Sequence, residues 1–541
     1  MRSISIKEVL ENTVKNYGNN IAYTYFNKNK LIEVRYYEFY NDIVKLGAYI
    51  NSLKLKNKRI AIIGKNSYEW ALSYMSVVCG DFVVVPFDKE LTSYEISTYS
   101  KKANIDCIIY SNELEDKVLE GCKKTKIKKI SFLQSDKTIS IPEILQKKFK
   151  SVDLENYCKT EIDPNDLTAL LFTSGTTKTQ KIVMLSQNNI MNDVIMCNNA
   201  FNLTEKDKFF SLLPLHHMYE CTAGFLLPIF LGASVHYIRG FRYIKNELLT
   251  SNPTIILCVP RVIETFYNII TKEIRDKNLY KVVKFLMKIT NSVFKNNYII
   301  KKKIFGQIHK NFGKNFRFFI CGGAPMNIEI AKYMNKLGFR IFEGYGITEC
   351  SPIVSVNNFN YNKLGSTGKV FQGLKVKIVN PDNNGVGEIY VKGPTVMLGY
   401  YKNYKLNKKV FHNGYFNTED LGYIDSEGYL YIVGRTKNLI LGPNGENIFP
   451  EEIENLLLQN NIIKEVIVSG KTTRNNVNLC ADIVVNSDYL KENNISKKDL
   501  PIIIQEIIDE TNRKIVFFKR ISSFNIMNHE FEKTSTLKIK R

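Results

Sequence analysis

The 541-residue sequence lacks the features that define several large protein classes. Its ten cysteines include no Cys-x-x-Cys pair, which argues against a zinc site or a disulfide framework. No run approaches the ~20 consecutive apolar residues that span a bilayer. The first eight residues lack the apolar stretch of a signal peptide, and no repetitive tract is present. We therefore expect a folded protein of the reducing cytoplasm.

Acidic residues are scarce: 75 Lys and Arg stand against 53 Asp and Glu, for a formal charge of +22. Nucleic-acid binding would need these basic residues to be gathered among exposed aromatics, and no nucleic-acid motif is present. Anionic substrates such as ATP and coenzyme A, or an anionic lipid surface, explain the charge more simply.

The length exceeds one ordinary core and suits a large domain followed by a smaller one. Over the first 165 residues, helical patterns alternate with strands that are apolar on both faces, which predicts an α/β fold. The expected helices are 9–17, 40–53 and 70–79, and the expected strands are 21–26, 32–37, 59–64, 83–86 and 105–110.

A hydroxyl-rich loop lies between two apolar runs, 169–172 and 182–185, so this stretch is predicted to be strand–loop–strand. Its hydroxyls and N–H groups can donate to phosphate oxygens, and Lys181 adds a positive charge. The Gly-Lys-Ser/Thr ending of a Walker A loop is missing, and an ordinary Ser/Thr-rich turn remains the alternative. The candidate phosphate-binding residues are Thr173, Ser174, Gly175, Thr176, Thr177 and Lys181.

Two glycine clusters follow the predicted strands 318–320 and 341–343. Ligands bind α/β folds at the carboxyl ends of parallel strands, although the first cluster could equally be a tight turn. In the second, Tyr345 can cover a flat base, Thr348 can reach phosphate, and Glu349 offers a hard oxygen ligand for Mg²⁺. The candidate residues are Gly322, Gly323 and Ala324, then Gly344, Tyr345, Gly346, Thr348 and Glu349.

Three further segments carry candidate residues. Asp420, predicted at a strand end, suits bidentate acceptance from ribose hydroxyls, and Arg435 suits ribose or phosphate; a turn is the alternative for Asp420. The pair His216–His217 could be part of a metal site, a catalytic pair or packing residues. A metal site is disfavoured, because no further ligand stands nearby at metal-binding spacing. The chain ends in a basic segment that contains Lys538.

The tract 272–317 holds thirteen Lys or Arg against two acidic residues. Val282, Leu286, Ile289 and Val293 form one helical stripe, and the lysines lie largely off it. Such a helix either docks its stripe on the core and leaves a solvated lysine face, or lies peripherally on an anionic membrane.

Taken together, these segments resemble the adenylate-forming (AMP-binding) superfamily, and most closely its bacterial long-chain fatty acyl-CoA synthetases. The family loop reads Thr-Ser-Gly-Thr-Thr-Gly-x-Pro-Lys-Gly, and this chain departs from it at Lys178, Gln180 and Ile182. The segments GGAPMN, FEGYGITEC and NTEDLG, and the later GRTK, also match.

The resemblance implies a large, multi-subdomain N-terminal adenylation domain, 1–434, and a small, mobile α+β domain, 435–541, joined by a hinge at Lys437. It implies that Lys538 enters the active site, with Leu537 replacing the usual glycine. Thr348 and Glu349 would also serve catalysis, and His217 would line the acyl pocket. The implied reactants are ATP with Mg²⁺, coenzyme A, and a carboxylic acid, foremost a long-chain fatty acid.

Other functions stay open. The acid could be another carboxylate, or the acceptor could be the thiol of an acyl carrier protein. The loop changes and Leu537 also allow a catalytically impaired relative. A nucleic-acid binder is the weakest alternative. The expected location is the cytoplasm, with peripheral contact at the inner membrane face as an open possibility.

Overall fold

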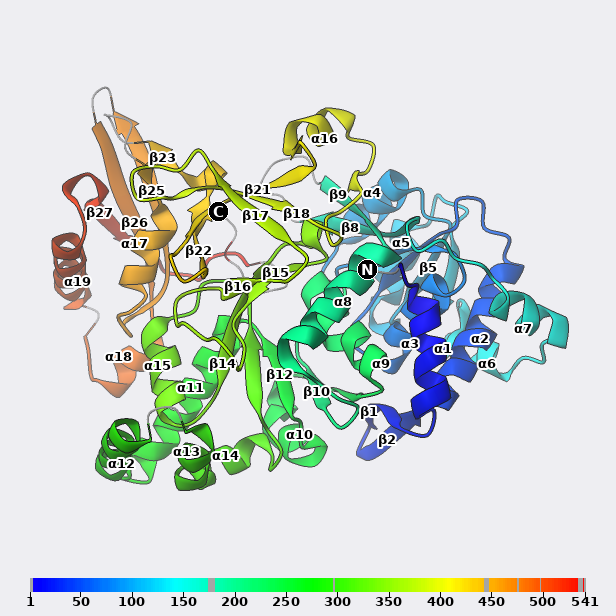
Figure 1. The fold of residues 1–541 in the computed structure, drawn as a ribbon, viewed down its shortest axis with the longest axis horizontal. Helices are drawn as coiled ribbons and strands as arrows, with labels where there is room; N and C mark the ends of the chain where they lie inside the picture. Colours follow the sequence, from blue (N-terminus) through cyan, green and yellow to red (C-terminus); the bar gives the residue numbers. More distant parts are fainter. Residues whose placement is uncertain are drawn as a thin grey trace.

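The computed structural model describes residues 3–173, 181–294, 297–441, 447–473, 476–496, 498–533 and 539. It has an α/β architecture, with a large N-terminal part and a small C-terminal part (Figure 1). Among the helices of these described ranges, none combines the length and the apolar character needed to cross a bilayer.

One large sheet has nine strands and carries the two glycine clusters. Its strands are parallel from β14 to β1, while β2, β15 and β16 run antiparallel to their neighbours. In spatial order the strands are β16 (Lys369–Val370), β15 (Ile353–Val356), β14 (Ile341–Gly346), β13 (Phe318–Cys321), β12 (Ile255–Cys258), β10 (Lys208–Ser211), β11 (Ser234–Tyr237), β1 (Ile21–Asn27) and β2 (Lys30–Arg35).

A second large sheet has eight strands and carries the predicted hairpin. Strands β8 and β9 pair antiparallel with Thr173 opposite Lys181, which confirms the two predicted strands. The predicted loop between them, 174–180, lies outside the described residues. In spatial order the strands are β19 (Gly399–Tyr400), β9 (Lys181–Ser186), β8 (Leu167–Thr173), β4 (Val83–Phe87), β3 (Arg59–Ile63), β5 (Cys107–Tyr110), β6 (Lys128–Ser131) and β7 (Ile139–Ser140).

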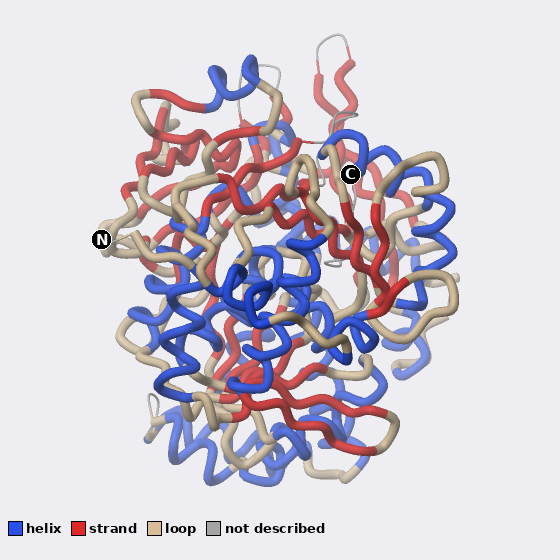
Figure 2. Tube along the Cα trace, turned by 90° about the vertical axis from the view of Figure 1, so that its right-hand side faces the viewer, coloured by secondary structure: helices blue, strands red, loops and turns tan. Residues whose placement is uncertain are grey.

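The strands of both large sheets are apolar on both faces, so each sheet needs helices on both sides. One layer of helices lies between the two sheets and covers a face of each. Ile60 and Ile62 of β3 join one core with the inner helices and the nine-stranded sheet, whereas Ala61 and Ile63 face the outer helices. Figure 2 shows helices between an upper and a lower group of strands. The inner core includes α1 (Ile6–Tyr17), α2 (Tyr36–Ser52), α3 (Tyr68–Val78), α8 (Gln187–Phe201) and α9 (Leu227–Leu231), and the outer layers hold α4 (Ser93–Ala103) and α5 (Glu115–Gly121) on one side and α10 (Ile244–Ser251), α11 (Pro260–Asp276), α12 (Tyr280–Val293) and α15 (Ile328–Lys336) on the other.

Shorter elements complete the large part. A five-stranded antiparallel sheet is built from β17 (Lys375–Val379), β18 (Gly387–Lys392), β21 (Tyr415–Ile424), β20 (Phe411–His412) and β22 (Leu430–Arg435). Its β21 corrects one prediction, since Asp420 lies inside this strand, opposite Arg435 on β22, and not at a strand end. The remaining helices are α6 (Ile141–Gln146), α7 (Ser151–Cys158), α13 (Tyr298–Ile304), α14 (Gly306–His309) and α16 (Tyr404–Val410).

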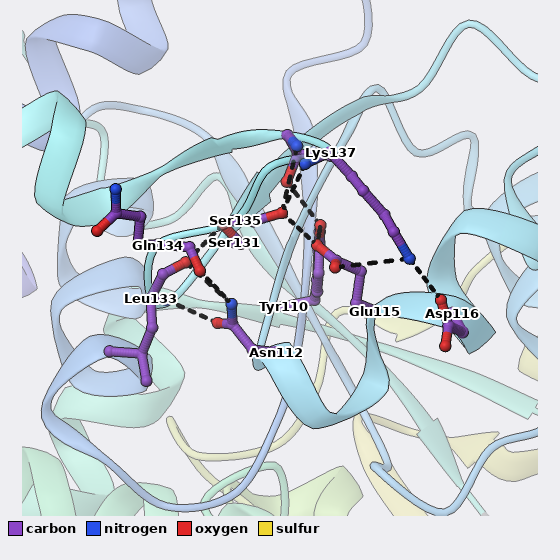
Figure 3. Close-up of polar contacts among 10 residues, drawn as sticks. Tyr110, Asn112, Glu115, Asp116, Ser131, Leu133, Gln134, Ser135 and Lys137 are labelled. Carbon is purple, nitrogen blue, oxygen red and sulfur yellow. Dashed lines mark hydrogen bonds and ion pairs between the residues drawn. The ribbon is translucent and has the colours of Figure 1, made fainter.

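Polar contacts fix the far edge of the eight-stranded sheet (Figure 3). The side chain of Asn112, just after β5, donates to the carbonyls of Leu133 and Gln134, each at 3.0 Å. Tyr110 and Ser135 both donate to Oε1 of Glu115, at 2.8 and 2.6 Å. This edge is scaffold, and it closes the sheet away from the candidate site.

The small C-terminal part has a core of its own, made largely of Ile, Leu and Val. Its helix α17 begins at Pro450, and proline suits the first turn of a helix. The elements are β23 (Ile440–Leu441), β24 (Asn447–Ile448), α17 (Pro450–Leu457), β25 (Ile463–Thr473), β26 (Asn476–Val485), α18 (Ser487–Glu492), α19 (Leu500–Lys514) and β27 (Ile521–Ile526).

Helix α12 does not pack its predicted apolar stripe, Val282, Leu286, Ile289 and Val293, against the core. The residues that face the core are Val283, Met287 and Thr290. In the predicted stripe, Val282, Ile289 and Val293 are exposed and Leu286 is only half-buried. The lysine face is solvated as expected, but the stripe is not what attaches the helix to the core.

Candidate active site

Lys181 lies where three structural elements converge. It is the first residue of β9, and its Nζ lies 3.0 Å from Oε2 of Glu419 on β21. The same Nζ lies 5.2 Å from the ring centroid of Tyr400 on β19. Tyr400 in turn donates from its hydroxyl to Oε1 of Glu349 at 2.8 Å. These contacts bring a lysine and two carboxylates from distant parts of the sequence into one cluster.

Asp420 is the centre of a second set of contacts beside the first. Its side chain is 4% exposed, and its Oδ2 accepts from the hydroxyl of Tyr345 at 2.6 Å. Its Oδ1 lies 2.8 Å from Nε of Arg435, the residue that it faces across β21 and β22. Burial and these two partners hold the carboxylate of Asp420 in one orientation.

The two predicted glycine clusters lie side by side, because β13 and β14 are neighbours. A Cβ on Gly322 would stand 3.4 Å from the carbonyl oxygen of Gly344. A Cβ on Gly346 would collide with the backbone of Pro352, so packing alone already requires this glycine. Strand β14 also runs on through Gly346, further than the sequence predicts, and Ala324 lies exposed beyond β13.

Buried residues fix the turn that follows Thr348 and Glu349. Ser351 has a left-handed backbone, with φ of 74°, and its carbonyl accepts from Oγ1 of Thr222 at 2.8 Å. Asp193 of α8 accepts from the N–H of Ile353 at 3.0 Å. Burial raises the pKa of Glu349, and the hydrogen bond from Tyr400 partly offsets that rise. Tyr400, Asp193 and Thr222 gave no periodic or motif signal, so sequence reasoning missed them.

The loop that carries His216 and His217 is held by a residue from the other sheet. Asn66, just beyond β3, donates to the carbonyl of Leu213 at 2.7 Å and accepts from the N–H of Leu215 at 2.9 Å. His216 Nε2 lies 3.5 Å from Asp88 Oδ2, and the two histidine rings are 4.1 Å apart between centroids. The neighbouring residue Ser67 caps the following helix α3, where its hydroxyl accepts from the N–H of Trp70 at 3.3 Å.

A buried carboxyl group lies behind this loop. Glu220 begins a π-helix that spans Glu220–Leu226, and its side chain is 1% exposed. Its Oε1 accepts from Oγ of Ser211 at 2.6 Å, and that Oγ accepts from Nδ2 of Asn66 at 2.9 Å. Burial raises the pKa of Glu220 to about 8. A π-helix is rare, and it frequently marks a functional region.

The candidate magnesium ligand, Glu349, could hold Mg²⁺ only together with substrate phosphates and water. The described residues contain no group of three or more His, Cys, Asp or Glu that could hold a metal. Glu349 is the predicted ligand, and it shares its cluster with Lys181, the predicted phosphate-binding lysine. Mg²⁺ is commonly held by one or two carboxylates together with substrate phosphates and water, and this donor set suits that mode.

Comparison with known protein families identifies the family of this chain. The model of the AMP-binding enzyme family matches residues 10–401, and the model of the AMP-binding enzyme C-terminal domain matches residues 437–541. The chain belongs to the AMP-binding enzyme family. It is therefore a ligase of this family, with a large N-terminal and a small C-terminal domain.

Curated members of the AMP-binding family are similar at low identity. The long-chain-fatty-acid–[acyl-carrier-protein] ligase AEE15 of Arabidopsis thaliana is 26% identical, over 87% of this chain and 75% of that protein. Long-chain-fatty-acid–CoA ligase FadD15 of Mycobacterium bovis is 26% identical, over 76% of this chain and 71% of that protein. The long-chain-fatty-acid–CoA ligase of Escherichia coli is 32% identical, over 58% of this chain and 52% of that protein.

Solved structures of AMP-binding enzymes share the fold. The anthranilate CoA ligase AuaEII in complex with anthranoyl-AMP superimposes with a TM-score of 0.79 at 18% identity, covering 99% of this chain and 96% of that one. The o-succinylbenzoate–coenzyme A synthetase of Bacillus subtilis, in complex with ATP and magnesium ion, gives 0.75 at 21% identity, covering 98% of each chain. Identities this low establish the fold and leave the substrate open.

The structure brings together six of the predicted site residues that it describes. Thr173, Lys181, Tyr345, Glu349, Asp420 and Arg435 lie on the converging elements above. Lys437 lies in the short 3₁₀ turn just after β22. Glu419 stood inside a matched segment but carried no predicted role. The predicted residues Ser174, Gly175, Thr176, Thr177 and Lys538 lie outside the described residues.

Proposed function

We propose that this protein activates a carboxylic acid, foremost a long-chain fatty acid, with ATP, and then transfers the acyl group to coenzyme A. AMP and pyrophosphate would be released. The single observation that carries the proposal is the convergence of Lys181, Glu349 and Asp420 in one site. Family membership and the fatty-acid ligases among the relatives support the choice of acid.

Each converging residue has a role in the proposal. Lys181 and the hydroxyl loop 173–177 would hold the β- and γ-phosphates of ATP. Asp420 and Arg435 would bind the ribose, and the Gly322–Ala324 and Gly344–Gly346 segments would line the adenine. Glu349 would hold Mg²⁺ and Thr348 would reach phosphate, while His217 would lie near the reacting carboxylate.

The chemistry needs positioning and charge neutralisation more than covalent help. A carboxylate oxygen of the acid attacks the α-phosphorus of ATP and pyrophosphate leaves, which gives an acyl-adenylate. A thiolate then attacks the acyl carbon, the C–O bond breaks, and AMP leaves. Mg²⁺ would neutralise phosphate charge while bound to Glu349. Lys538 would neutralise the acid and the α-phosphate as these two anions meet.

The proposal includes two moving domains. The large domain would comprise residues 1–434 and the small domain residues 435–541, with the hinge at Lys437. The two half-reactions need different surroundings at the same adenylate, so the small domain would rotate between them. Lys437 suits this role because it follows the last strand of the large part directly.

An acyl carrier protein is a second candidate acceptor, because a relative that matches 87% of this chain is named as a ligase for that carrier. We further propose a cytoplasmic location with peripheral contact to an anionic membrane through residues 272–317. Exposed apolar and basic residues on α12 support that contact.

Pyrophosphate release tests the proposal. The purified chain would be given ATP, Mg²⁺ and a panel of carboxylic acids, with coenzyme A, with acyl carrier protein or with neither, beside the variant Lys538→Ala. Release with long-chain acids that depends on Lys538 and yields AMP and acyl-CoA would support the proposal. Release that yields a thioester only with acyl carrier protein would favour the second acceptor. If no acid in the panel supports release, the chain is a catalytically impaired relative and the proposal fails.

A further inference from the structure

Helix α12 turns large apolar side chains away from the protein core. Its buried residues, Val283, Met287 and Thr290, attach one side of the helix to the large domain. Another side of the helix exposes Phe285 by 63% and Val293 by 65%, together with Val282 and Ile289. The spacing of 3, 4 and 4 residues places these four on one side of the helix.

Exposed lysines lie beside this apolar side. Lys281, Lys284 and Lys288 are all exposed, and no ion pair joins them to an acidic group within the described residues. We define the α12 surface as the four apolar residues, Val282, Phe285, Ile289 and Val293, together with these three lysines. Single exposed apolar residues are ordinary, but a contiguous set of this size indicates an interaction surface.

We propose that the α12 surface docks the protein peripherally onto an anionic lipid bilayer. A helix with an apolar side and adjacent lysines lies in the plane of the interface, with its apolar residues among the acyl chains. The lysine stems can reach along the apolar layer and place their charges at anionic headgroups. The helix lies at the outer edge of the large domain, where a flat surface can reach it (Figure 1).

The lysine charges disfavour a second copy of this chain as the partner of the α12 surface. A symmetric dimer built on this surface would gather the three lysines of each copy, Lys281, Lys284 and Lys288, around one shared apolar contact, and the α12 surface contains no acidic residue to pair with them. Juxtaposed like charges of this kind are costly in an interface. An anionic bilayer satisfies the apolar side and the lysines together. The inference narrows the proposed membrane contact of residues 272–317 to the α12 surface. It can fail while the ligase function holds, because docking needs neither ATP nor acid.

Vesicle sedimentation of the full chain tests the inference. Vesicles would contain phosphatidylcholine alone, or phosphatidylcholine with 30% phosphatidylglycerol, without nucleotide or fatty acid. We expect binding to the anionic vesicles that weakens as salt is raised, because salt screens the lysine charges. Phe285→Ser combined with Val293→Ser should weaken binding by about tenfold or more. Replacing the three lysines by glutamine should weaken binding by a similar or larger factor, and only to anionic vesicles.

Phe517→Ser provides a matched control. Phe517 is 81% exposed, lies in the small domain, and has the guanidinium of Arg520 5.5 Å from its ring centroid. It is therefore also an exposed ring beside a cation, and its loss should leave vesicle binding unchanged. Thermal unfolding of each variant checks that the fold is retained.

Three results would overturn the inference. The wild-type chain could fail to bind anionic vesicles. Phe517→Ser could weaken binding as much as the α12 variants do. The wild-type chain could instead self-associate with rising concentration in sedimentation experiments, with Phe285→Ser abolishing that association, which would make the α12 surface an interface between copies.

Discussion

Lys181 and Glu419 form an ion pair of 3.0 Å that joins the first residue of β9 to the middle of β21. Glu419 has a left-handed backbone, with φ of 60°, which a glycine adopts without strain. If Lys181 holds the phosphates of ATP, those phosphates must compete with Glu419 for the ammonium group. The pair thus keeps the lysine ordered, and it also lowers the affinity of the site for phosphate.

Glu419→Gly tests this competition. We expect the KM for ATP to fall by about three- to tenfold, since the lysine no longer has a protein carboxylate as partner. Losing a half-exposed ion pair costs at most about 1 kcal/mol, and relief of the left-handed backbone returns a similar amount, so stability should change little. Steady-state kinetics and thermal unfolding measure both effects. A KM that rises would show that Glu419 helps nucleotide binding.

Tyr400→Phe tests the support of Glu349. The hydroxyl of Tyr400 donates to Glu349 at 2.8 Å and lowers the pKa of a carboxyl group that burial raises. Without it, the pKa of Glu349 should rise further, so the acid limb of kcat/KM for ATP should move to higher pH. Higher Mg²⁺ should restore part of the loss, because the ion competes with the proton for the carboxylate.

Tyr401→Phe is the control for that experiment. Tyr401 is the next residue and accepts from Arg59 at 2.6 Å, so it is a tyrosine of the same segment with a different partner. Its pH profile should match that of the wild-type protein. Equal shifts in both variants would mean that the effect arises from the β19 segment as a whole.

Features that depend on neighbouring residues could be predicted from the sequence, whereas contacts between residues distant in the sequence could not. The strands β8 and β9 were predictable, because local apolar runs determine them. Asp420 was predicted as a site residue but at the wrong place in its strand, since the pairing with Arg435 is a matter of sheet register.

Residues that support the site from a distance could not be predicted. Tyr400 meets Glu349 across 51 positions, and Asp193 meets Ile353 across 160. Neither contact leaves a trace in hydrophobic periodicity. The α12 stripe was found, but periodicity cannot say which side of a helix the core will occupy when both sides carry apolar residues.

Glu220→Gln tests the protonation state of the buried carboxyl group. Burial raises its folded pKa from 4.5 to about 8, so the folded protein keeps a proton that the unfolded chain releases. The free energy of unfolding should therefore fall as pH rises from about 5 to 8, by up to a few kcal/mol. Glutamine keeps an acceptor for Ser211 without a charge, so this fall should be largely absent from the variant. Denaturant unfolding at pH 5, 6.5 and 8 measures it, and identical slopes would contradict a raised pKa.

Asn66→Ala tests the clamp on the histidine loop. Asn66 makes hydrogen bonds to Ser211, Leu213 and Leu215, and its removal should cost about 1–3 kcal/mol of stability. We expect the KM for the acid to rise several-fold while the KM for ATP stays nearly constant, because the loop would line the acyl pocket.

Ser67→Ala is the matched control, since it removes a helix cap one residue away and costs about 1 kcal/mol. It should lower stability without changing the KM for the acid. If both variants raise that KM equally, general destabilisation explains the effect and the clamp has no specific role.

The central claim is that a carboxylate attacks the α-phosphorus of ATP in the site formed by Lys181, Glu349 and Asp420. The most direct test supplies a fatty acid labelled with ¹⁸O in its carboxylate, together with ATP, Mg²⁺ and coenzyme A, and weighs the nucleotide product by mass spectrometry. The account predicts AMP that carries one ¹⁸O atom, because the bridging oxygen leaves with AMP when the thiol attacks the acyl carbon. Unlabelled AMP, or ADP as the product, would contradict it.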